Sequence, residues 1–223
     1  MNLSHFDFSA PLFFKENYAM LVVENAGKLF EYCNDLFMQQ QGEDGRFIIF
    51  DGDKEISFKK SGHIIFDFFN LSVDDKKIVN GLLAKLQKIS DEKFVSEQWN
   101  IRCKLIDLLE KLNFECGYPI EYNEEFAVTE LLKAVKVLPK SEYDGILEKT
   151  ANYIDAVCEF TDIKLIVFVG LCEFFNAEEF ESFAKHVAYS SVNVLMIEKR
   201  QPSFDTDKKM MIIDNDLCEI LVN

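Results

Sequence analysis

The sequence predicts an α/β protein: a head with a parallel sheet, built from both ends of the chain, and an all-helical leg inserted into it. Short apolar runs typical of buried strands occur near both ends and alternate with segments of helical spacing. From Asp74 to Leu112 the apolar residues instead keep a helical period almost throughout. The 48% hydrophobic content of the 223 residues can bury a substantial core. We therefore assign residues 1–70 and 141–223 to the head and 71–140 to the leg.

The first part of the head is predicted to run strand, turn, helix, strand. Apolar runs short enough for strands occur at Ser4–Phe8, Leu12–Glu16 and Ala19–Val23. A helix is expected over Gly27–Phe37, because its apolar residues recur at helical spacing, and Phe47–Phe50 returns to a strand. This order is typical of an α/β layer with some parallel pairing.

The leg is predicted to contain three helices. Two long ones fit between Asp74 and Leu112, where apolar residues form one face of each helix. The third is expected over Val128–Val135, after the acidic loop Glu121–Glu125.

The last part of the head is predicted to hold a βαβ unit. After a helix over Tyr143–Phe160, strands at Leu165–Val169 and Val194–Glu198 flank a helix at Ala177–Tyr189. Such a crossover is right-handed and places both strands in one parallel sheet. A final hairpin is expected from the strands Met210–Ile213 and Glu219–Val222, which enclose the turn residues Asp214, Asn215 and Asp216.

Composition excludes several classes of protein. No stretch approaches the ~18 consecutive apolar residues that span a bilayer, and the first ten residues lack the pattern of a signal peptide. We expect a cytoplasmic protein without a membrane partner. The six cysteines are scattered and expected to be reduced core residues, and the three histidines suggest no transition-metal site. The net charge of −15 opposes nucleic-acid binding unless a local basic strip provides it.

The sequence at Gly27-Lys28 matches part of a phosphate-binding loop motif and lacks the rest. Such a loop needs a leading Gly and a Ser or Thr after the Lys to hold magnesium, and this chain has Val22 and Leu29 there. The strand Leu165–Val169 ends in Gly170 rather than in an acidic residue that would bind magnesium. The sequence therefore predicts a P-loop-NTPase-like head without nucleotide hydrolysis.

A second candidate site is the pair Asp51 and Asp53 after an apolar strand. Some phosphate-handling enzymes use a first Asp as nucleophile and a second, two residues later, as acid and base. Those enzymes usually continue with Thr or Val, where this chain has Lys54-Glu55. A solvated turn is the favoured interpretation, and a phosphate-handling enzyme using Asp51 and Asp53 remains the alternative function.

The acidic loop offers oxygen ligands for a hard cation such as calcium. Its candidate ligands include Glu121, Asn123 and Glu124, but the spacing is not that of an EF-hand. Carboxylates before a helix are also explained by the positive end of the helix dipole, so both interpretations stay open.

Basic residues are few but grouped. Lys199 and Arg200 follow the end of a predicted parallel strand, where α/β sheets commonly place ligand sites. Lys133 lies in the third leg helix, and Lys136 and Lys140 follow it. We expect the three lysines to emerge where the leg rejoins the head. A solvated face is the default interpretation of any one group, and these five residues are the candidates for a basic strip.

The whole chain, most densely its last quarter, resembles the non-nuclease Csn-type adaptation protein of type II-A CRISPR systems. The sharpest match is the ending Glu198-x-Arg200-Gln201 after the last parallel strand. Further matching segments are Leu21–Glu24, Glu130–Val135, Leu165–Val169, Phe174-Phe175, Glu178–Phe183 and Val192–Ile197.

The resemblance implies a protein of CRISPR adaptation (spacer acquisition) that binds double-stranded DNA ends without sequence preference. It implies a homotetrameric ring with lysines lining its hole, no enzymatic activity and no cofactor required for chemistry. Implied partners are the spacer integrase and the effector nuclease. It also implies calcium ions, with ligands in the loop matching Pro119–Glu130. Pro119 and Asn123 depart from the acidic residues that relatives can have there, whereas Glu130 is retained and Glu121 or Glu124 could compensate.

Overall fold

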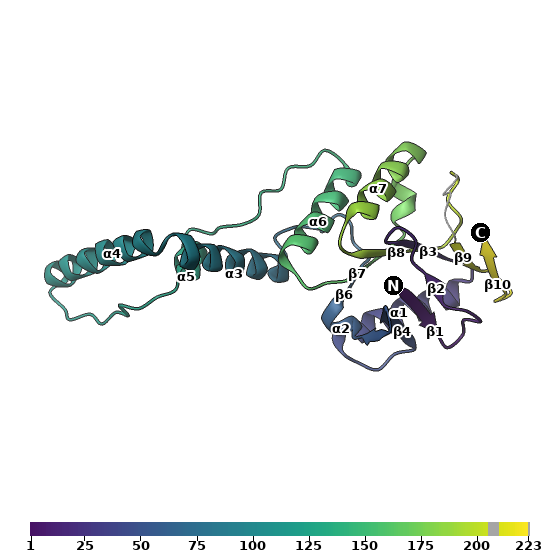
Figure 1. Ribbon diagram of the computed structural model, residues 1–223, viewed down its shortest axis with the longest axis horizontal. Coiled ribbons are helices and arrows are strands. Elements are labelled where there is room, and N and C mark those ends of the chain that lie inside the picture. Colours follow the sequence, from purple (N-terminus) through teal and green to yellow (C-terminus); the bar gives the residue numbers. More distant parts are fainter. Residues whose placement is uncertain (205–209, 223) are drawn as a thin grey trace. The chain divides into compact units, whose positions relative to one another are not determined.

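The computed structural model describes residues 1–204 and 210–222. Contacts divide the chain into two compact units (Figure 1). We call residues 1–73 with 141–223 the head, and residues 74–140 the leg. Each unit is described by itself below.

The head is built on a six-stranded, mostly parallel sheet with the order β10-β9-β3-β8-β7-β6. Its central strands β3 (Tyr18–Val23), β8 (Asn193–Glu198) and β7 (Leu165–Val169) pair in parallel. The outer strands are β6 (Gly62–Ile65), β9 (Met210–Ile213) and the antiparallel edge strand β10 (Glu219–Val222). Every residue of β3 is buried, as expected for a strand covered on both faces. The prediction of an α/β fold with a parallel sheet is confirmed.

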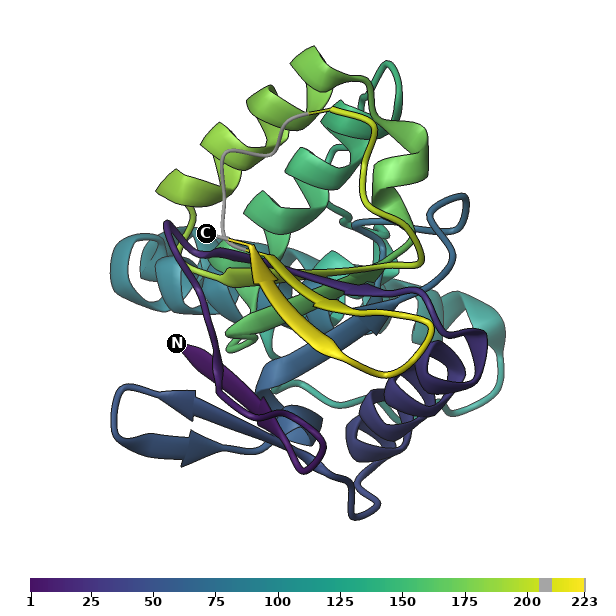
Figure 2. The ribbon, with the colours of Figure 1, turned by 90° about the vertical axis from the view of Figure 1, so that its right-hand side faces the viewer.

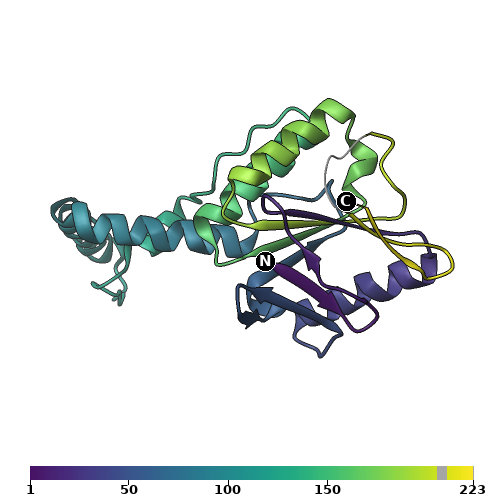
Figure 3. The same ribbon diagram turned by 45° about the vertical axis from the view of Figure 1, so that its right-hand side comes forward.

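Helices cover both faces of this sheet (Figures 2 and 3). Helices α6 (Ile146–Phe160) and α7 (Ala177–Tyr189) lie on one face, and α1 (Ala26–Gln41) lies on the other. A short 3₁₀ helix, η1 (Leu171–Phe174), follows β7. The core on the α1 side includes buried residues of the sheet, of α1 and of a second, smaller sheet.

The smaller sheet is antiparallel, and its first two strands end earlier than the sequence predicts. It has the order β2 (Leu12–Phe13), β1 (Asn2–His5), β4 (Phe47–Asp51) and β5 (Lys54–Ile56), and the one-turn helix α2 (Phe58–Ser61) follows it.

The strand predicted at residues 4–8 ends at His5, whose carbonyl accepts a hydrogen bond from Phe8 N at 2.9 Å. The strand predicted at residues 12–16 ends at Phe13, because Glu16 and Asn17 adopt φ of 51° and 62° in a tight turn. Lys15 and Tyr18 exchange both backbone hydrogen bonds across that turn. Left-handed conformations at two non-glycine residues give no strong sequence signal, so the turn was missed.

The leg consists of α3 (Lys76–Lys93), α4 (Val95–Cys116) and α5 (Val128–Ala134). Asp75 caps α3 by accepting a hydrogen bond from Lys77 N at 2.8 Å, and α4 ends at Gly117 with a φ of 68°. Helix α4 has no buried residue: Trp99 is 61% exposed and Phe114 is 85% exposed. Among the described residues of the leg, nothing therefore buries the apolar face of α4 completely.

Two further expectations concern membrane-spanning helices and the burial of the cysteines. Among the described residues, no helix combines the length and apolarity needed to cross a membrane. All six cysteines are free, but only Cys33 and Cys172 are buried. The expectation of core cysteines is wrong for Cys103, Cys116 and Cys218, which are exposed.

Candidate nucleic-acid interface

The predicted leg lysines gather at the end of α5. Lys133 lies in its last turn, and Lys136 and Lys140 follow it. Helix α5 closes with hydrogen bonds from Val137 N to Leu132 O at 2.9 Å and from Lys136 N to Lys133 O at 3.0 Å. Lys136 takes the left-handed position of this motif, with a φ of 56°. A lysine at this position costs about 1 kcal/mol relative to the usual glycine, so its side chain is retained against a local backbone preference.

Lys133 shares an open hollow of about 600 Å³ with Arg102, a residue that sequence reasoning missed. The guanidinium of Arg102 donates to Phe126 O at 3.1 Å and lies 5.5 Å from the centre of the Phe126 ring. Arg102 stands between Ile101 and Cys103 in a long helix, where nothing in the local pattern distinguishes it. The hollow is also lined by Glu125 and Glu130.

The predicted head residues Lys199 and Arg200 lie directly after β8 and are exposed. The last residue of β8, Glu198, is 2% exposed and accepts a hydrogen bond from Cys172 N at 3.0 Å. Burial raises the pKa of Glu198 to about 7, against the lowering effect of that hydrogen bond. The hydrogen bond between Glu198 and Cys172 N thus joins the end of β8 to η1. The next two residues, Lys199 and Arg200, are exposed to solvent.

Some cations of the head have carboxylate partners, whereas Lys199 and Arg200 have none among the described residues. Lys28, Arg46 and Lys164 are all held in ion pairs. Within residues 1–204 and 210–222, no ion pair engages the predicted residues Lys133, Lys136, Lys199 or Arg200. Their charge is available to an external anion.

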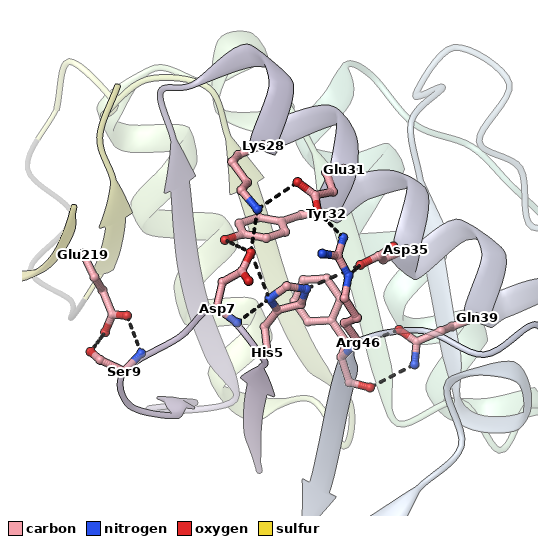
Figure 4. A network of polar contacts seen from close by, with 11 residues as sticks. His5, Asp7, Ser9, Lys28, Glu31, Tyr32, Asp35, Gln39, Arg46 and Glu219 are labelled. Carbon is pink, nitrogen blue, oxygen red and sulfur yellow. Dashed lines mark hydrogen bonds and ion pairs between the residues drawn. The ribbon is translucent and has the colours of Figure 1, made fainter. Parts of the chain in front are cut away.

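The incomplete phosphate loop is closed by the protein's own groups (Figure 4). Lys28 Nζ lies 2.7 Å from Asp7 Oδ2 and 2.9 Å from Glu31 Oε2, and both contacts raise the pKa of Lys28. Only Glu24 and Asn25 separate β3 from α1, and Asn25 Oδ1 accepts a hydrogen bond from Lys28 N at 3.1 Å. The helix start is capped and its lysine is neutralised, so the phosphate cradle is missing.

The network around Lys28 continues to a buried histidine (Figure 4). Arg46 contacts Glu31 and, at 2.8 Å, Asp35, whose carboxylate lies 3.4 Å from His5 Nε2. His5 Nδ1 accepts a hydrogen bond from Asp7 N at 3.1 Å, so the neutral ring fits this site. Burial lowers the pKa of His5 and favours the same form. The network joins β1, α1 and β4 and has a structural role.

The alternative aspartates lie at the tip of a hairpin. Asp51 pairs with Lys54 across the turn, and Gly52 supplies its φ of 63°. Lys164 Nζ lies 2.5 Å from Asp51 Oδ2 and lowers the pKa of that carboxyl. Asp51 is paired with Lys164, and both aspartates lie at the turn of an antiparallel hairpin, so the geometry favours the solvated-turn interpretation.

The candidate calcium ligands make local hydrogen bonds. Asn123 Oδ1 accepts from Glu125 N and Glu130 Oε2 accepts from Ala127 N, both at 3.0 Å, while Glu121 and Glu124 are exposed. In the part of the chain that the structure describes, no three His, Cys, Asp or Glu side chains converge to hold a metal ion. This arrangement does not fit a calcium site.

Comparison with known proteins identifies the family. The model of the family described as CRISPR-associated protein (Cas_Csn2) matches residues 39–217. The crystal structure of Stu0660 of Streptococcus thermophilus superposes with a TM-score of 0.63 at 14% identity, over 96% of this chain and 75% of that one. This likeness shows the fold alone. No match was found among curated proteins. Because the family model covers most of the chain, this protein belongs to the Cas_Csn2 family of CRISPR-associated proteins.

Proposed function

We propose that this protein serves CRISPR adaptation (spacer acquisition) by binding double-stranded DNA ends non-specifically through a homotetrameric ring, without catalysis. The observation that carries the proposal is a set of exposed cations on an acidic chain of the Cas_Csn2 family. Lys133, Lys136, Lys199 and Arg200 of this set take part in no ion pair among the described residues. Phosphates would meet Lys133, Lys136 and Lys140 in the leg and Lys199 and Arg200 in the head. Arg102 would add a contact beside Lys133.

The charge balance favours local, sequence-independent contacts. With a net charge of −15, the protein as a whole repels a phosphate backbone, so affinity must come from a few concentrated cations. Lysines contact phosphates as point charges and carry little base information. The acidic remainder of the surface would limit binding outside the ring.

The absence of catalysis is part of the proposal. We infer that the head is P-loop-NTPase-like in shape and has lost the phosphate cradle, because Asn25 caps α1 and two carboxylates hold Lys28. The alternative, a phosphate-handling enzyme, would need a free carboxylate at Asp51, which is paired with Lys164.

The assembly and its partners extend the same proposal. The uncovered apolar residues of α4, such as Trp99 and Phe114, would pack between copies in the ring. A ring on DNA ends in the cytoplasm would hand the DNA to the spacer integrase and work beside the effector nuclease. Calcium near Glu121 and Glu130 would tune the leg only if that loop rearranges.

Gel filtration and a salt titration of DNA binding test the proposal. We expect a tetramer that shifts linear duplex DNA and fails to bind closed circular DNA, with and without calcium. Each phosphate contact contributes about 0.9 to the slope of log affinity against log salt. The double variants Lys133→Ala/Lys136→Ala and Lys199→Ala/Arg200→Ala should therefore each lower that slope by about 2 for every subunit whose two cations contact phosphate.

Lys59→Ala/Lys60→Ala is the matched control, because it removes two exposed charges from α2 of the head. Its slope should remain that of the wild type. Equal binding to circular and linear DNA, or a monomer at micromolar concentration, would contradict the ring. Unchanged slopes in both test variants would place the DNA contacts elsewhere.

A further inference from the structure

The head carries an aromatic pocket that the proposed function does not use. Four rings, those of Phe68, Phe69, Tyr143 and Phe174, surround a cavity of about 240 Å³ together with Ile146 and Lys149. They come from three segments: the stretch after β6, the start of α6 and η1. All three segments belong to the head.

Contacts among its own residues hold this pocket open. Phe68 is buried, and its ring lies 5.6 Å from that of Phe174. Phe69 is 81% exposed, yet its ring stands at 88° to Phe174, 6.0 Å away, and its carbonyl accepts a hydrogen bond from Lys149 Nζ at 2.7 Å. The same ammonium lies 5.2 Å from the centre of the Tyr143 ring. These contacts reduce the freedom that the lining side chains would lose on binding a guest, which lowers the entropic cost.

The backbone at Gly145 also serves the pocket. Gly145 has a φ of 98° and a ψ of 177°, a conformation essentially restricted to glycine, and lies between Tyr143 and the start of α6. A methyl group at this glycine would meet nothing within 4 Å, so the pocket is open on this side. The chain thus reverses beside the cavity without filling it.

Size and lining select an apolar guest. A dry cavity of about 150 Å³ lined by apolar side chains holds benzene, so this pocket has room for one leucine or phenylalanine side chain. Exposed aromatic rings around such a hollow are typical of anchor pockets in protein interfaces.

The charged residues near the pocket indicate which residues can flank the guest side chain. Asp67, Asp144 and Glu173 directly precede the lining residues Phe68, Gly145 and Phe174. Phe69 N donates to Asp67 Oδ1 at 3.0 Å, and Asp144 N donates to Glu148 Oε2 at 2.7 Å. Lys149 is the single cation in the lining. The excess of carboxylates opposes a phosphate and favours positive residues beside the guest.

We propose that the aromatic pocket binds one large apolar side chain, leucine or phenylalanine, presented by a basic segment of another protein. The apolar side chain supplies affinity by burying the rings of Phe69, Tyr143 and Phe174. The lysines or arginines on either side of it orient the partner segment through the carboxylates near the pocket. They also raise the association rate at low salt. This surface lies in the head and does not require the DNA contacts or the ring.

A methyl NMR titration of the full chain, labelled at isoleucine, tests the proposal through Ile146. The probe is the capped peptide acetyl-Lys-Arg-Leu-Lys-Arg-amide at about millimolar concentration. Comparison peptides replace its leucine by alanine or its four basic residues by glutamate, and a short thymidine oligonucleotide represents a nucleobase guest. We expect the Ile146 methyl signal to shift with the leucine peptide and binding to weaken at least about tenfold for each comparison peptide.

Phe69→Ala and Tyr143→Ala should each weaken the leucine peptide by about tenfold, since both rings are largely exposed and their loss leaves the core intact. Phe30→Ala is the matched control, because it removes an exposed ring from α1, and it should bind as the wild type does. No shift with the leucine peptide, or equal binding of the alanine peptide, overturns the proposal. Binding of the oligonucleotide that is lost in Phe69→Ala would assign the pocket to nucleobases instead.

Discussion

The head and the leg place similar apolar residues in opposite surroundings. In the head, Phe168 of β7 and Ile197 of β8 are fully buried between layers of helices. In the leg, α4 carries apolar residues at comparable density, but none of them is buried. Hydrophobic spacing thus predicts which residues share a face, but it does not predict whether another layer covers this face. The head has an extensive core, whereas the leg buries Ile78 and Leu83 of α3 and no residue of α4.

The largest expected effect comes from removing a core ring in the head. Phe168→Ala should lower the free energy of unfolding by about 3–5 kcal/mol, because it loses a buried side chain and leaves a cavity. Leu112→Ala in α4 should change it by no more than about 0.5 kcal/mol in dilute solution, because Leu112 is half exposed. Urea denaturation followed by circular dichroism measures both.

Repeating the Leu112→Ala measurement at high protein concentration sharpens the comparison. If copies cover α4, the cost of the substitution should rise with concentration. A cost in dilute solution as large as that of Phe168→Ala would show that the leg has a core of its own, against the contrast drawn above.

The second effect is a pH dependence located in the head. Because burial raises the pKa of Glu198 from 4.5 to about 7, the stability linked to this group is full below pH 4.5 and is lost as the pH rises through 7. A pKa difference of this size corresponds to about 3 kcal/mol. Urea midpoints between pH 4.5 and 8 should show this loss.

Glu198→Gln isolates this group, since an amide oxygen can still accept the hydrogen bond from Cys172 N. The variant should be more stable than the wild type at pH 8 and similar to it near pH 4.5. His5 acts in the opposite direction: burial lowers its pKa below 6.5, so its contribution is present above 6.5 and is lost on acidification. A difference between the variant and the wild type that does not change with pH would rule out the role of Glu198.

The smallest effect concerns the leg. Lys136→Gly should raise the stability of the α5 terminus by about 1 kcal/mol, because glycine adopts the left-handed φ of 56° without strain. Amide hydrogen exchange in α5 should slow by several fold, while the DNA salt slope falls by about 0.9 for every subunit in which Lys136 contacts phosphate. Lys136→Ala is the control: it lowers the slope equally and leaves the strain in place. Slower exchange in both variants would show that charge, and not backbone conformation, destabilises this terminus.

The sequence predicted the second half of the head best. The bounds of β7, α7, β9 and β10 are those predicted, because each segment has one clear period and is limited by turn residues. The strand β6 was missed, since four residues that begin with Gly62 give too short a pattern. Helix α1 is longer than predicted, because its polar last turn has no apolar spacing to reveal it. Gly42 caps the end of this helix.

The candidate site was predictable only where charge clusters along the chain. Lys133, Lys136, Lys140, Lys199 and Arg200 could be chosen from sequence, and their contact with DNA stays a prediction. Arg102 and the aromatic pocket could not be predicted, because their neighbours are distant in sequence and meet only in the fold. The capping of α1 by Asn25 likewise became visible only with the hydrogen bond to Lys28 N.

The strand order has a consequence for synthesis on the ribosome. Strand β3 emerges early, but its two neighbours in the sheet, β8 and β9, are translated near the other end of the chain. The residues of the leg are contiguous and are translated in between. The head sheet therefore cannot close until the last strands have left the ribosome, and its contact order is high. The early apolar strand must wait unpaired, which exposes it to aggregation and makes chaperone protection valuable during that interval.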